Sequence, residues 1–210
     1  MAVADSNLKF VAVDVGAYGR QSDGDTLSAS RFGKCLENGT LGLPPIQALP
    51  NTSTLAPHVF VGDEAFQLRQ DFLRPYSGRH QTEEKRIFNY RLSRARRCVE
   101  NTFGIMVSRF RVFRRPINLL PENVDYVVMA CCVLHNFLRE DPVYQSRSHE
   151  DEATSGQQHA NGGQAMFPLQ PPVGHNYSRS AASVRDMFCE YFMSPQGAIP
   201  WQRAYAGLRT

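Results

Sequence analysis

A long segment with helical periodicity is the feature that most limits how this chain can fold. Across residues 82–103, apolar side chains recur at steps of four, three, four and four, which places them on one face of a helix. These side chains are Phe88, Leu92, Ala95, Val99 and Phe103. Thr82 can cap the start of the helix, and Glu83 and Glu84 suit its positive end. The pattern predicts a helix that must bury one face against a core.

Two short, mainly apolar runs that are rich in β-branched residues predict buried strands. The first covers residues 8–15 and ends at Gly16, and the second covers residues 58–61 and is closed by Gly62 and Asp63. Because the first run is apolar at nearly every position, we expect a central strand that is covered on both faces.

Further segments predict two helices and a basic extended stretch. Residues 26–36 follow a Ser/Asp-rich start and predict a short helix. Residues 123–138 are strongly apolar and begin with Asn123 as a cap, so we expect this helix to pack deep against the sheet. Residues 109–115 are basic and β-prone, and residues 116–121 form a break between two prolines.

The composition changes after Asp141. Residues 144–172 are dominated by Gln, Ser, Gly, His and Pro, and they hold too few large apolar side chains to offset the entropy of ordering them. Helical spacing returns at residues 183–193. We therefore expect a globular domain over residues 5–139, a disordered linker over 140–182, and a C-terminal helix and tail over 183–210. That tail could dock on the domain or wait for a partner.

Composition excludes several classes of protein. The chain has 210 residues, and a hydrophobic content of 42% is enough for a real core. Its five cysteines are an odd number without CxxC spacing, which favours neither a zinc site nor a disulfide framework and points to a reducing compartment. The start lacks the pattern of a signal peptide, and the longest apolar run, residues 127–134, is too short to span a membrane.

Two acidic residues occupy positions that suit a catalytic site. Asp63 follows a buried strand, and in open α/β sheets sites gather at the carboxyl ends of strands. It could instead cap a turn or helix within residues 64–73. Glu100 borders the apolar face of the long helix and can point toward a sheet edge, or it could pair with Arg96 one turn earlier. Each position alone favours the structural alternative.

Positive charge is concentrated in residues 83–115. This segment holds ten Lys and Arg side chains against three Glu, although the whole chain has a formal net charge of only +3. Arg86, Arg94 and Arg97 should share the helix face opposite the apolar one, and such a ridge could bind phosphates with release of counterions. A charged helix face can equally be only solvated. Charge alone leaves both alternatives open.

Three segments, taken in order, resemble the Harbinger-type transposase-derived nucleases, a branch of the DDE transposase superfamily. They are KFVAVDVGAYGRQSD at residues 9–23, VFVGDEAFQLRQDFLRPY at 59–76 and FNYRLSRARRCVENTFGIMVSRFRVF at 88–113. A Leu-His-Asn element follows at residues 134–136. The resemblance covers roughly residues 5–139, and several matched segments in the right order are more specific than either acid alone.

The resemblance implies that Asp63 and Glu100 are catalytic. In this family a Gly-Asp after a strand carries the second catalytic Asp, and an Arg-rich helix ending in Glu-x-x-Phe-Gly carries the Glu. The implied fold is α/β, a ribonuclease-H-like mixed sheet flanked by helices, whose acids hold Mg²⁺ or Mn²⁺. Hard cations prefer oxygen ligands, and two ions about 4 Å apart can activate the nucleophile and stabilise the leaving oxygen of a phosphodiester. Asp23 matches an acid after the family's Gly-rich turn and could lie near this site, or it could cap a turn or helix.

The family's first catalytic Asp has no counterpart by motif in this sequence. In the family it lies on an earlier strand, in an Ile-Asp-Gly-like segment, and neither Asp5 nor Asp14 matches that segment. We therefore expect a fold that is incomplete at its first strand and an endonuclease that is inactive or weak as this fragment. His135 in the Leu-His-Asn element is expected to be a hydrogen-bonded core residue.

Two functions follow from the resemblance. The first is a divalent-metal-dependent DNA endonuclease that cleaves phosphodiesters at a DDE carboxylate site. The second is a domesticated, non-catalytic module that binds nucleic acid or protein. In either case Arg86, Arg94, Arg97 and Arg109 are the expected contacts with DNA. The family implies a Myb-like DNA-binding partner protein, and the DNA substrate implies residence in the nucleus, with the cytoplasm as a further compartment.

Overall fold

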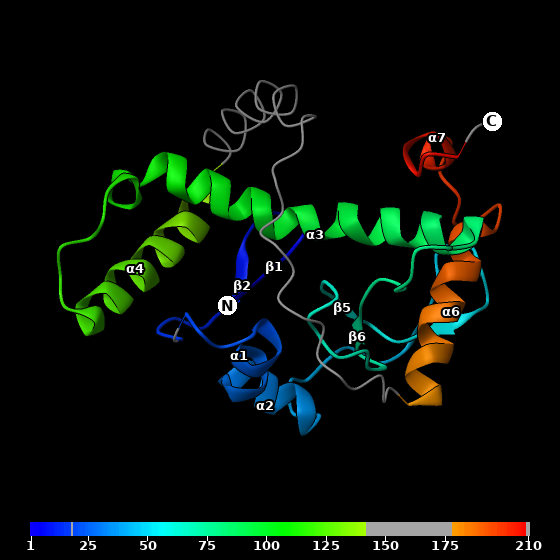
Figure 1. Ribbon diagram of the computed structural model, residues 1–210, viewed down its shortest axis with the longest axis horizontal. Coiled ribbons are helices and arrows are strands. Elements are labelled where there is room, and N and C mark those ends of the chain that lie inside the picture. Colours follow the sequence, from blue (N-terminus) through cyan, green and yellow to red (C-terminus); the bar gives the residue numbers. More distant parts are fainter. Residues whose placement is uncertain (18, 142–177, 209–210) are drawn as a thin grey trace. The chain divides into compact units, whose positions relative to one another are not determined.

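The computed structural model describes residues 1–17, 19–141 and 178–208, so the predicted disordered linker lies mostly outside the described residues. The described residues contain both helices and short strands, which is compatible with a mixed α/β class (Figure 1). The chain divides into two compact units. Unit 1 consists of Met1–Gln21 and the segment that begins at Cys98. Unit 2 consists of Ser22–Arg97 and the C-terminal helices. The long helix α3, Glu83–Arg109, contributes to both units.

Unit 1 contains a two-stranded antiparallel sheet of β1 (Ala2–Ala4) and β2 (Phe10–Val13), which pairs Ala2 with Val13. The predicted strand at residues 8–15 is therefore shorter than expected, because Leu8 adopts a left-handed φ of 58° and ends the turn before the strand. The prediction of a central strand covered on both faces is wrong for the described residues: β2 pairs only with β1, and Val11 is 63% exposed.

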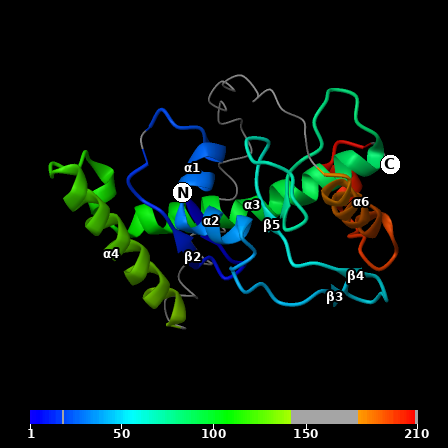
Figure 2. The same ribbon diagram turned by 90° about the horizontal axis from the view of Figure 1, so that it is seen from below.

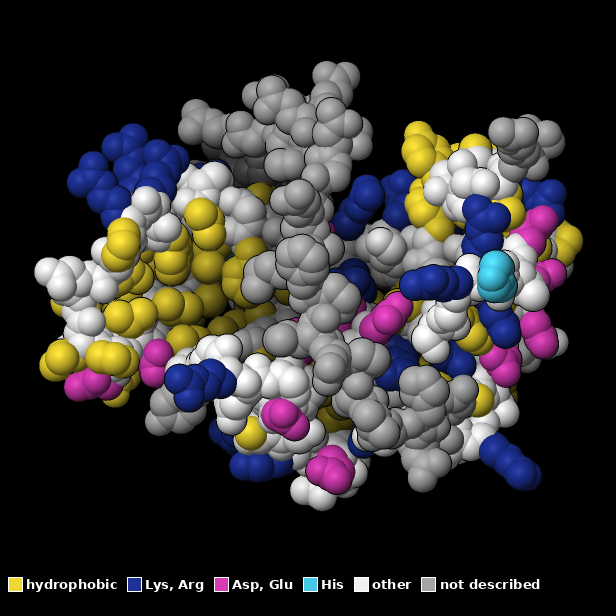
Figure 3. Space-filling model, in the orientation of Figure 1, with side chains coloured by type: hydrophobic (Ala, Val, Ile, Leu, Met, Phe, Trp, Pro, Cys, Tyr) yellow, Lys and Arg dark blue, Asp and Glu magenta, His cyan; other side chains and the backbone are white. Residues whose placement is uncertain are grey.

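Helix α4 (Pro121–Glu140) packs one face against β2. It begins two residues before the expected cap at Asn123, because a proline with its fixed φ suits the first position of a helix. Its buried residues form a core with strand β2 and the end of α3: Phe10, Met106, Cys131 and Cys132. The other face is exposed, so the expected deep packing holds for one face only (Figure 3). Its large exposed side chains are Tyr126, Met129, Val133, Leu134 and Phe137.

Polar side chains of α4 tie the helix to β2. The amide of Asn136 accepts a hydrogen bond from Phe10 N and donates one to Phe10 O, both at 2.8 Å. His135 is 3% exposed, and its Nε2 lies 2.7 Å from the carbonyl oxygen of Leu8. The prediction of a hydrogen-bonded core histidine is therefore confirmed.

The basic stretch before α4 is a 3-10 helix, η1 (Arg111–Arg114), and not a strand.

In unit 2, the predicted helix at residues 26–36 is two helices, α1 (Asp23–Ala29) and α2 (Arg31–Glu37). The chain breaks at Ser30, whose backbone is extended and whose Oγ accepts a hydrogen bond from Gly33 N at 2.9 Å. A serine with these contacts is a strong helix cap, so a new helix starts where the pattern predicted continuation.

The remaining strands of unit 2 form two small sheets. β3 (Gln47–Ala48) and β4 (Leu55–Ala56) form an antiparallel hairpin (Figure 2). β5 (Phe60–Val61) pairs in parallel with β6 (Phe72–Leu73), so the second predicted strand is present in shortened form. Within the described residues all sheets have two strands. A continuous ribonuclease-H-like sheet stays a prediction.

The core of unit 2 lies between α3 and the C-terminal helix α6 (Arg179–Met193), which starts earlier than the expected residue 183. Phe88 and Leu92 of α3 are buried as expected, and Ala181 and Cys189 of α6 pack in the same cluster. Farther along α3 the predicted face is wrong, because Ala95 and Phe103 are exposed and other residues are buried instead. A last short helix, α7 (Gln202–Tyr205), follows α6.

Candidate functional site

The turn that carries Asp63 depends on the glycine before it. Gly62 follows β5, and its N–H donates to the carbonyl of Leu73 at 2.9 Å. A Cβ atom at this position would come within 2.5 Å of the Phe72 ring and 2.6 Å of the Phe66 ring. Only glycine leaves room for both rings as they lie, which explains why a glycine stands where β5 ends. Asp63 follows a strand, as the sequence predicted.

The carboxylate of Asp63 has two protein partners. One oxygen accepts a hydrogen bond from Ala65 N at 3.0 Å, and the other lies 3.6 Å from a guanidinium nitrogen of Arg96. These side chains are 37% and 30% exposed, which leaves the ion pair partly open to solvent. Asp63 therefore caps its own turn, which supports the structural alternative, and it also faces a cation from α3.

Arg96 is the residue of this site that sequence reasoning missed. The sequence suggested only a pairing of Arg96 with Glu100 on the same helix, because that spacing is local. Its contact with Asp63 bridges 33 positions of the chain and joins α3 to the turn after β5. The order of the family-like segments was the only signal that placed these two regions in one site.

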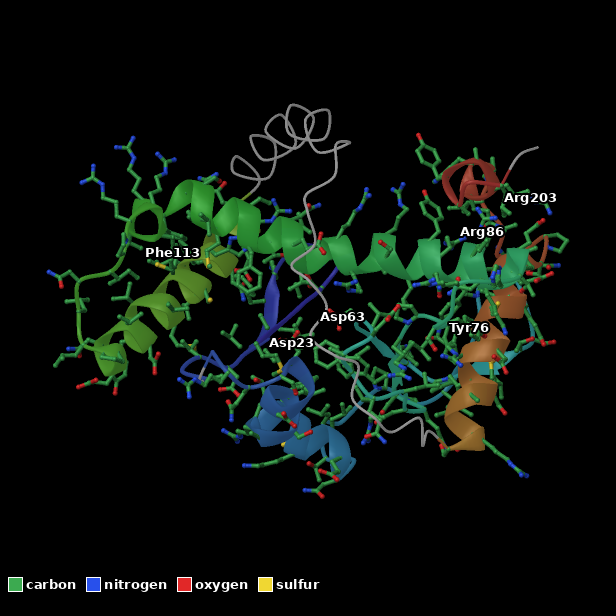
Figure 4. All side chains as sticks on the ribbon, in the orientation of Figure 1. Asp23, Asp63, Tyr76, Arg86, Phe113 and Arg203 are labelled. Carbon is green, nitrogen blue, oxygen red and sulfur yellow. The ribbon has the colours of Figure 1, made fainter. Side chains whose placement is uncertain are left out.

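Asp23 lies on a segment next to the Asp63 turn (Figure 4). It is the first residue of α1 and is exposed, and Ser22 caps the helix because its Oγ accepts a hydrogen bond from Asp25 N. A Cβ atom on Gly24 would lie 3.1 Å from the carbonyl oxygen of Ala65, so the first turn of α1 rests against the backbone after Asp63. The structure thus brings these two candidate acids onto adjacent segments.

Glu100 is exposed on α3 and belongs to unit 1, whereas Asp63 and Asp23 belong to unit 2. Carboxylate oxygens suit Mg²⁺ or Mn²⁺. Across residues 1–17, 19–141 and 178–208, however, no three His, Cys, Asp or Glu side chains gather closely enough to hold a metal ion. Arg96 also lies beside the carboxylate that would bind the cation.

The predicted DNA contacts on α3 differ in accessibility. Arg94 and Arg97 are exposed, and Arg94 donates a hydrogen bond to the hydroxyl of Tyr90 at 3.3 Å. Arg86 is half-buried, and its Nη2 donates to the carbonyls of Ala206 and Gly207 at 2.8 and 2.9 Å. Arg109 is half-buried in unit 1. Arg94 and Arg97 are therefore the members of this set best placed to meet phosphates.

Arg91 belongs to the structure of unit 2 rather than to an open basic surface. Its Nη1 donates to Gly197 O at 3.0 Å and to Gln202 Oε1 at 3.1 Å, and its guanidinium lies 4.3 Å from the centre of the Phe192 ring. Burial lowers the pKa of Arg91 from its ordinary value. This arginine fastens the C-terminal segment to α3.

A second group of exposed arginines surrounds η1 in unit 1. Figure 3 shows basic side chains gathered over the loop that holds this helix. The exposed members are Arg111, Arg114 and Arg115.

None of the helices in the described part of the chain has the length and apolar character needed to cross a bilayer.

The amino-acid sequence matches the family described as DDE superfamily endonuclease over residues 1–136. It is 26% identical over 161 residues to "Protein ALP1-like" of Arabidopsis thaliana. The aligned region covers 76% of this chain and 39% of that protein. It is 32% identical over 85 residues to "Putative nuclease HARBI1" of Homo sapiens. This aligned region covers 38% of this chain and 24% of that protein. No solved structure matches at a significant level.

The family match covers all of the candidate acids in the sequence. It includes the turn of Asp63, helix α3 with Glu100, and most of α4. The chain spans only 39% and 24% of the two curated relatives. These matches confirm the resemblance to Harbinger-derived nucleases. The chain belongs to the DDE superfamily endonucleases.

Proposed function

We propose that this chain is the part of a DNA endonuclease that binds the DNA backbone along α3. The observation that carries the proposal is the exposure of Arg94 and Arg97 on a helix inside the family match. Arginines that contact phosphates release condensed counterions, which favours binding without direct readout of sequence. In unit 1, Arg109 and the exposed arginines around η1 are the further residues that we assign to phosphate contacts.

Asp63 and Glu100 are the carboxylates that we assign to cleavage, with Asp23 beside Asp63. DDE superfamily endonucleases generally depend on divalent metal, and Mg²⁺ or Mn²⁺ would supply the charge that such chemistry needs. In this chain the Asp63 carboxylate is held by Ala65 N and Arg96. We therefore expect the chain alone to cleave DNA weakly or not at all.

The alternative function is a non-catalytic module that binds nucleic acid or protein. The contact between Asp63 and Arg96 favours it, since a guanidinium beside the carboxylate competes with a metal ion for the same charge. Under this alternative, DNA binding persists and cleavage is absent from any longer product. A Myb-like partner protein and residence in the nucleus are part of the proposal in either form.

The proposal is tested by the salt dependence of binding to a DNA duplex of arbitrary sequence. If about four to six phosphates are neutralised, log K should fall against log salt with a slope of about −4 to −5. Replacing both Arg94 and Arg97 with Ala should weaken binding and flatten the slope by about 2. The matched control is Arg31→Ala, which removes an exposed arginine from α2. The control should leave the slope unchanged.

An equal slope for the double variant and the wild type would overturn the proposal. In that case Arg94 and Arg97 would be solvated charges without a contact to DNA. Equal losses in the Arg31→Ala control would show that the slope reports net charge and not a binding face.

A further inference from the structure

A stacked pair of aromatic rings joins α7 to α3. The rings of Tyr90 and Tyr205 lie 6.1 Å apart between their centres and are nearly parallel, at 9°. Tyr90 is half-buried, whereas Tyr205 is 69% exposed. A stack of this kind has an inner face against the protein and an outer face open to solvent. The outer ring can accept another flat group as a further layer.

A second aromatic ring lies on the same side of the short helix. Trp201 stands four positions before Tyr205, and Tyr205 N donates to Trp201 O at 3.2 Å, so one helical turn places both side chains on one face. Trp201 is 44% exposed. We call Tyr90, Trp201 and Tyr205 the aromatic surface. Tyr and Trp are enriched at binding interfaces, because their rings offer a large apolar face and a polar group.

Contacts on both sides fix the position of the aromatic surface on α3. Arg86 donates to the carbonyls of Ala206 and Gly207, and Arg203 pairs with Glu83 (Figure 4). The backbone on either side of Tyr205 is therefore held to α3 independently of its ring. The ring is presented by a fixed backbone and not by a free tail.

The charge around the aromatic surface is positive. Residues 83–97 of α3 hold six Lys and Arg side chains against two Glu. Arg94 is exposed and bonds to the hydroxyl of Tyr90, which puts a guanidinium at the edge of the stack. Aromatic rings beside a basic track are the combination that binds single-stranded nucleic acid, since bases stack on the rings while phosphates meet the cations.

We propose that the aromatic surface binds unpaired bases of single-stranded DNA, with one base stacked on the outer face of Tyr205. A duplex cannot use this ring in the same way, because the faces of paired bases are already covered by their neighbours. The choice of DNA rests on the proposed function. The surface is distinct from the candidate acids, and it gives the chain a site for strands that are open or frayed.

The test compares an oligothymidine strand with a duplex, by fluorescence anisotropy of the labelled DNA. Tyr205→Ala should weaken binding of the single strand about tenfold, as expected for the loss of one stacked base. Tyr205→Phe keeps the ring and should bind within about twofold of the wild type. The matched control is Tyr126→Ala, which removes an exposed tyrosine from α4 and should have no effect.

A second signal comes from the protein itself. Trp201 is the chain's single tryptophan, so its fluorescence reports on this surface alone. Oligothymidine should quench it, and the duplex should quench it less. Because Tyr205→Ala removes no charge, it should leave duplex affinity and its salt slope unchanged. The Arg94→Ala and Arg97→Ala pair changes that slope, so failure of this site and failure of the proposed function can be told apart.

Equal single-strand affinity for Tyr205→Ala and the wild type would overturn the proposal. Tighter, Tyr205-dependent binding of oligouridine than of oligothymidine would overturn the assignment to DNA. Stronger single-strand binding by Tyr205→Ala would also contradict it, since the C-terminal segment would then be blocking α3 instead of extending its surface.

Discussion

The core of unit 2 and helix α4 of unit 1 differ in how far their apolar side chains are buried. In unit 2, Ile87 and Phe88 of α3 are 0% exposed, and Phe88 packs in one cluster with Ala181 and Cys189 of α6. In unit 1, α4 buries one face but leaves Tyr126, Val133 and Phe137 exposed at 75%, 64% and 69%. In unit 1, α4 contributes to the hydrophobic core through one face only, and polar side chains of that face also bond to β2 and the turn before it.

The largest expected effect compares one phenylalanine from each region. Phe88 lies between the rings of Tyr76 and Phe192, at 5.2 and 5.9 Å between centres, so Phe88→Ala should lower the free energy of unfolding by about 3–5 kcal/mol. Phe137→Ala on α4 should change it by less than about 0.5 kcal/mol. Urea denaturation of the two variants and the wild type measures both.

Similar losses of stability in the two variants would contradict the difference between the two regions. They would mean that Phe137 is covered in solution and that the exposed face of α4 has a partner there. A loss for Phe88→Ala below about 1 kcal/mol would contradict the account of the unit 2 core.

A smaller effect concerns the buried histidine that holds α4 to β2. Burial lowers the pKa of His135 below its ordinary value, and nearby Arg139 and Arg109 lower it further, while the hydrogen bond to Leu8 opposes them. The unfolded chain therefore binds a proton more readily than the folded one. The contribution to stability is fully present above the ordinary histidine pKa of about 6.5 and is lost as pH falls from there toward the lower folded pKa.

Denaturation midpoints measured between neutral and mildly acidic pH give the slope that checks this sign. His135→Asn should flatten the fall in stability, whatever it does to stability at neutral pH. His58→Asn, which removes an exposed histidine, should leave the slope as it is in the wild type. A steeper fall for His135→Asn would mean that His135 is charged in the folded chain.

Local sequence signals predicted the elements whose shape depends on near neighbours. The start of α3 at Glu83 and the break before α4 agree with the sequence, because a cap residue and prolines act within one turn. Ser30 was missed for the same local reason, since its capping contact outweighed the helical pattern around it. β6 was missed because its parallel pairing with β5 depends on a partner twelve positions away.

The candidate site was predictable only in part. The position of Asp63 after a strand and the exposure of Arg94 and Arg97 follow from local pattern. The contacts that occupy Arg86 and Arg91 could not be predicted, because their partners lie 120 and 106 positions away in a segment that resembled a loose tail. The sequence shows how many arginines the segment holds, but only the fold shows which of them already bond to other protein groups.

The most direct test of the account follows binding and cutting of the same labelled duplex by the purified 210-residue chain, with Mg²⁺ or Mn²⁺ present and absent. We predict salt-sensitive binding without appreciable cutting in either metal, because a guanidinium nitrogen of Arg96 lies 3.6 Å from the Asp63 carboxylate and competes there with a metal ion. Asp63→Asn should then leave binding unchanged. Efficient metal-dependent cutting that Asp63→Asn abolishes would contradict the account and would show that the acids of this chain suffice for catalysis.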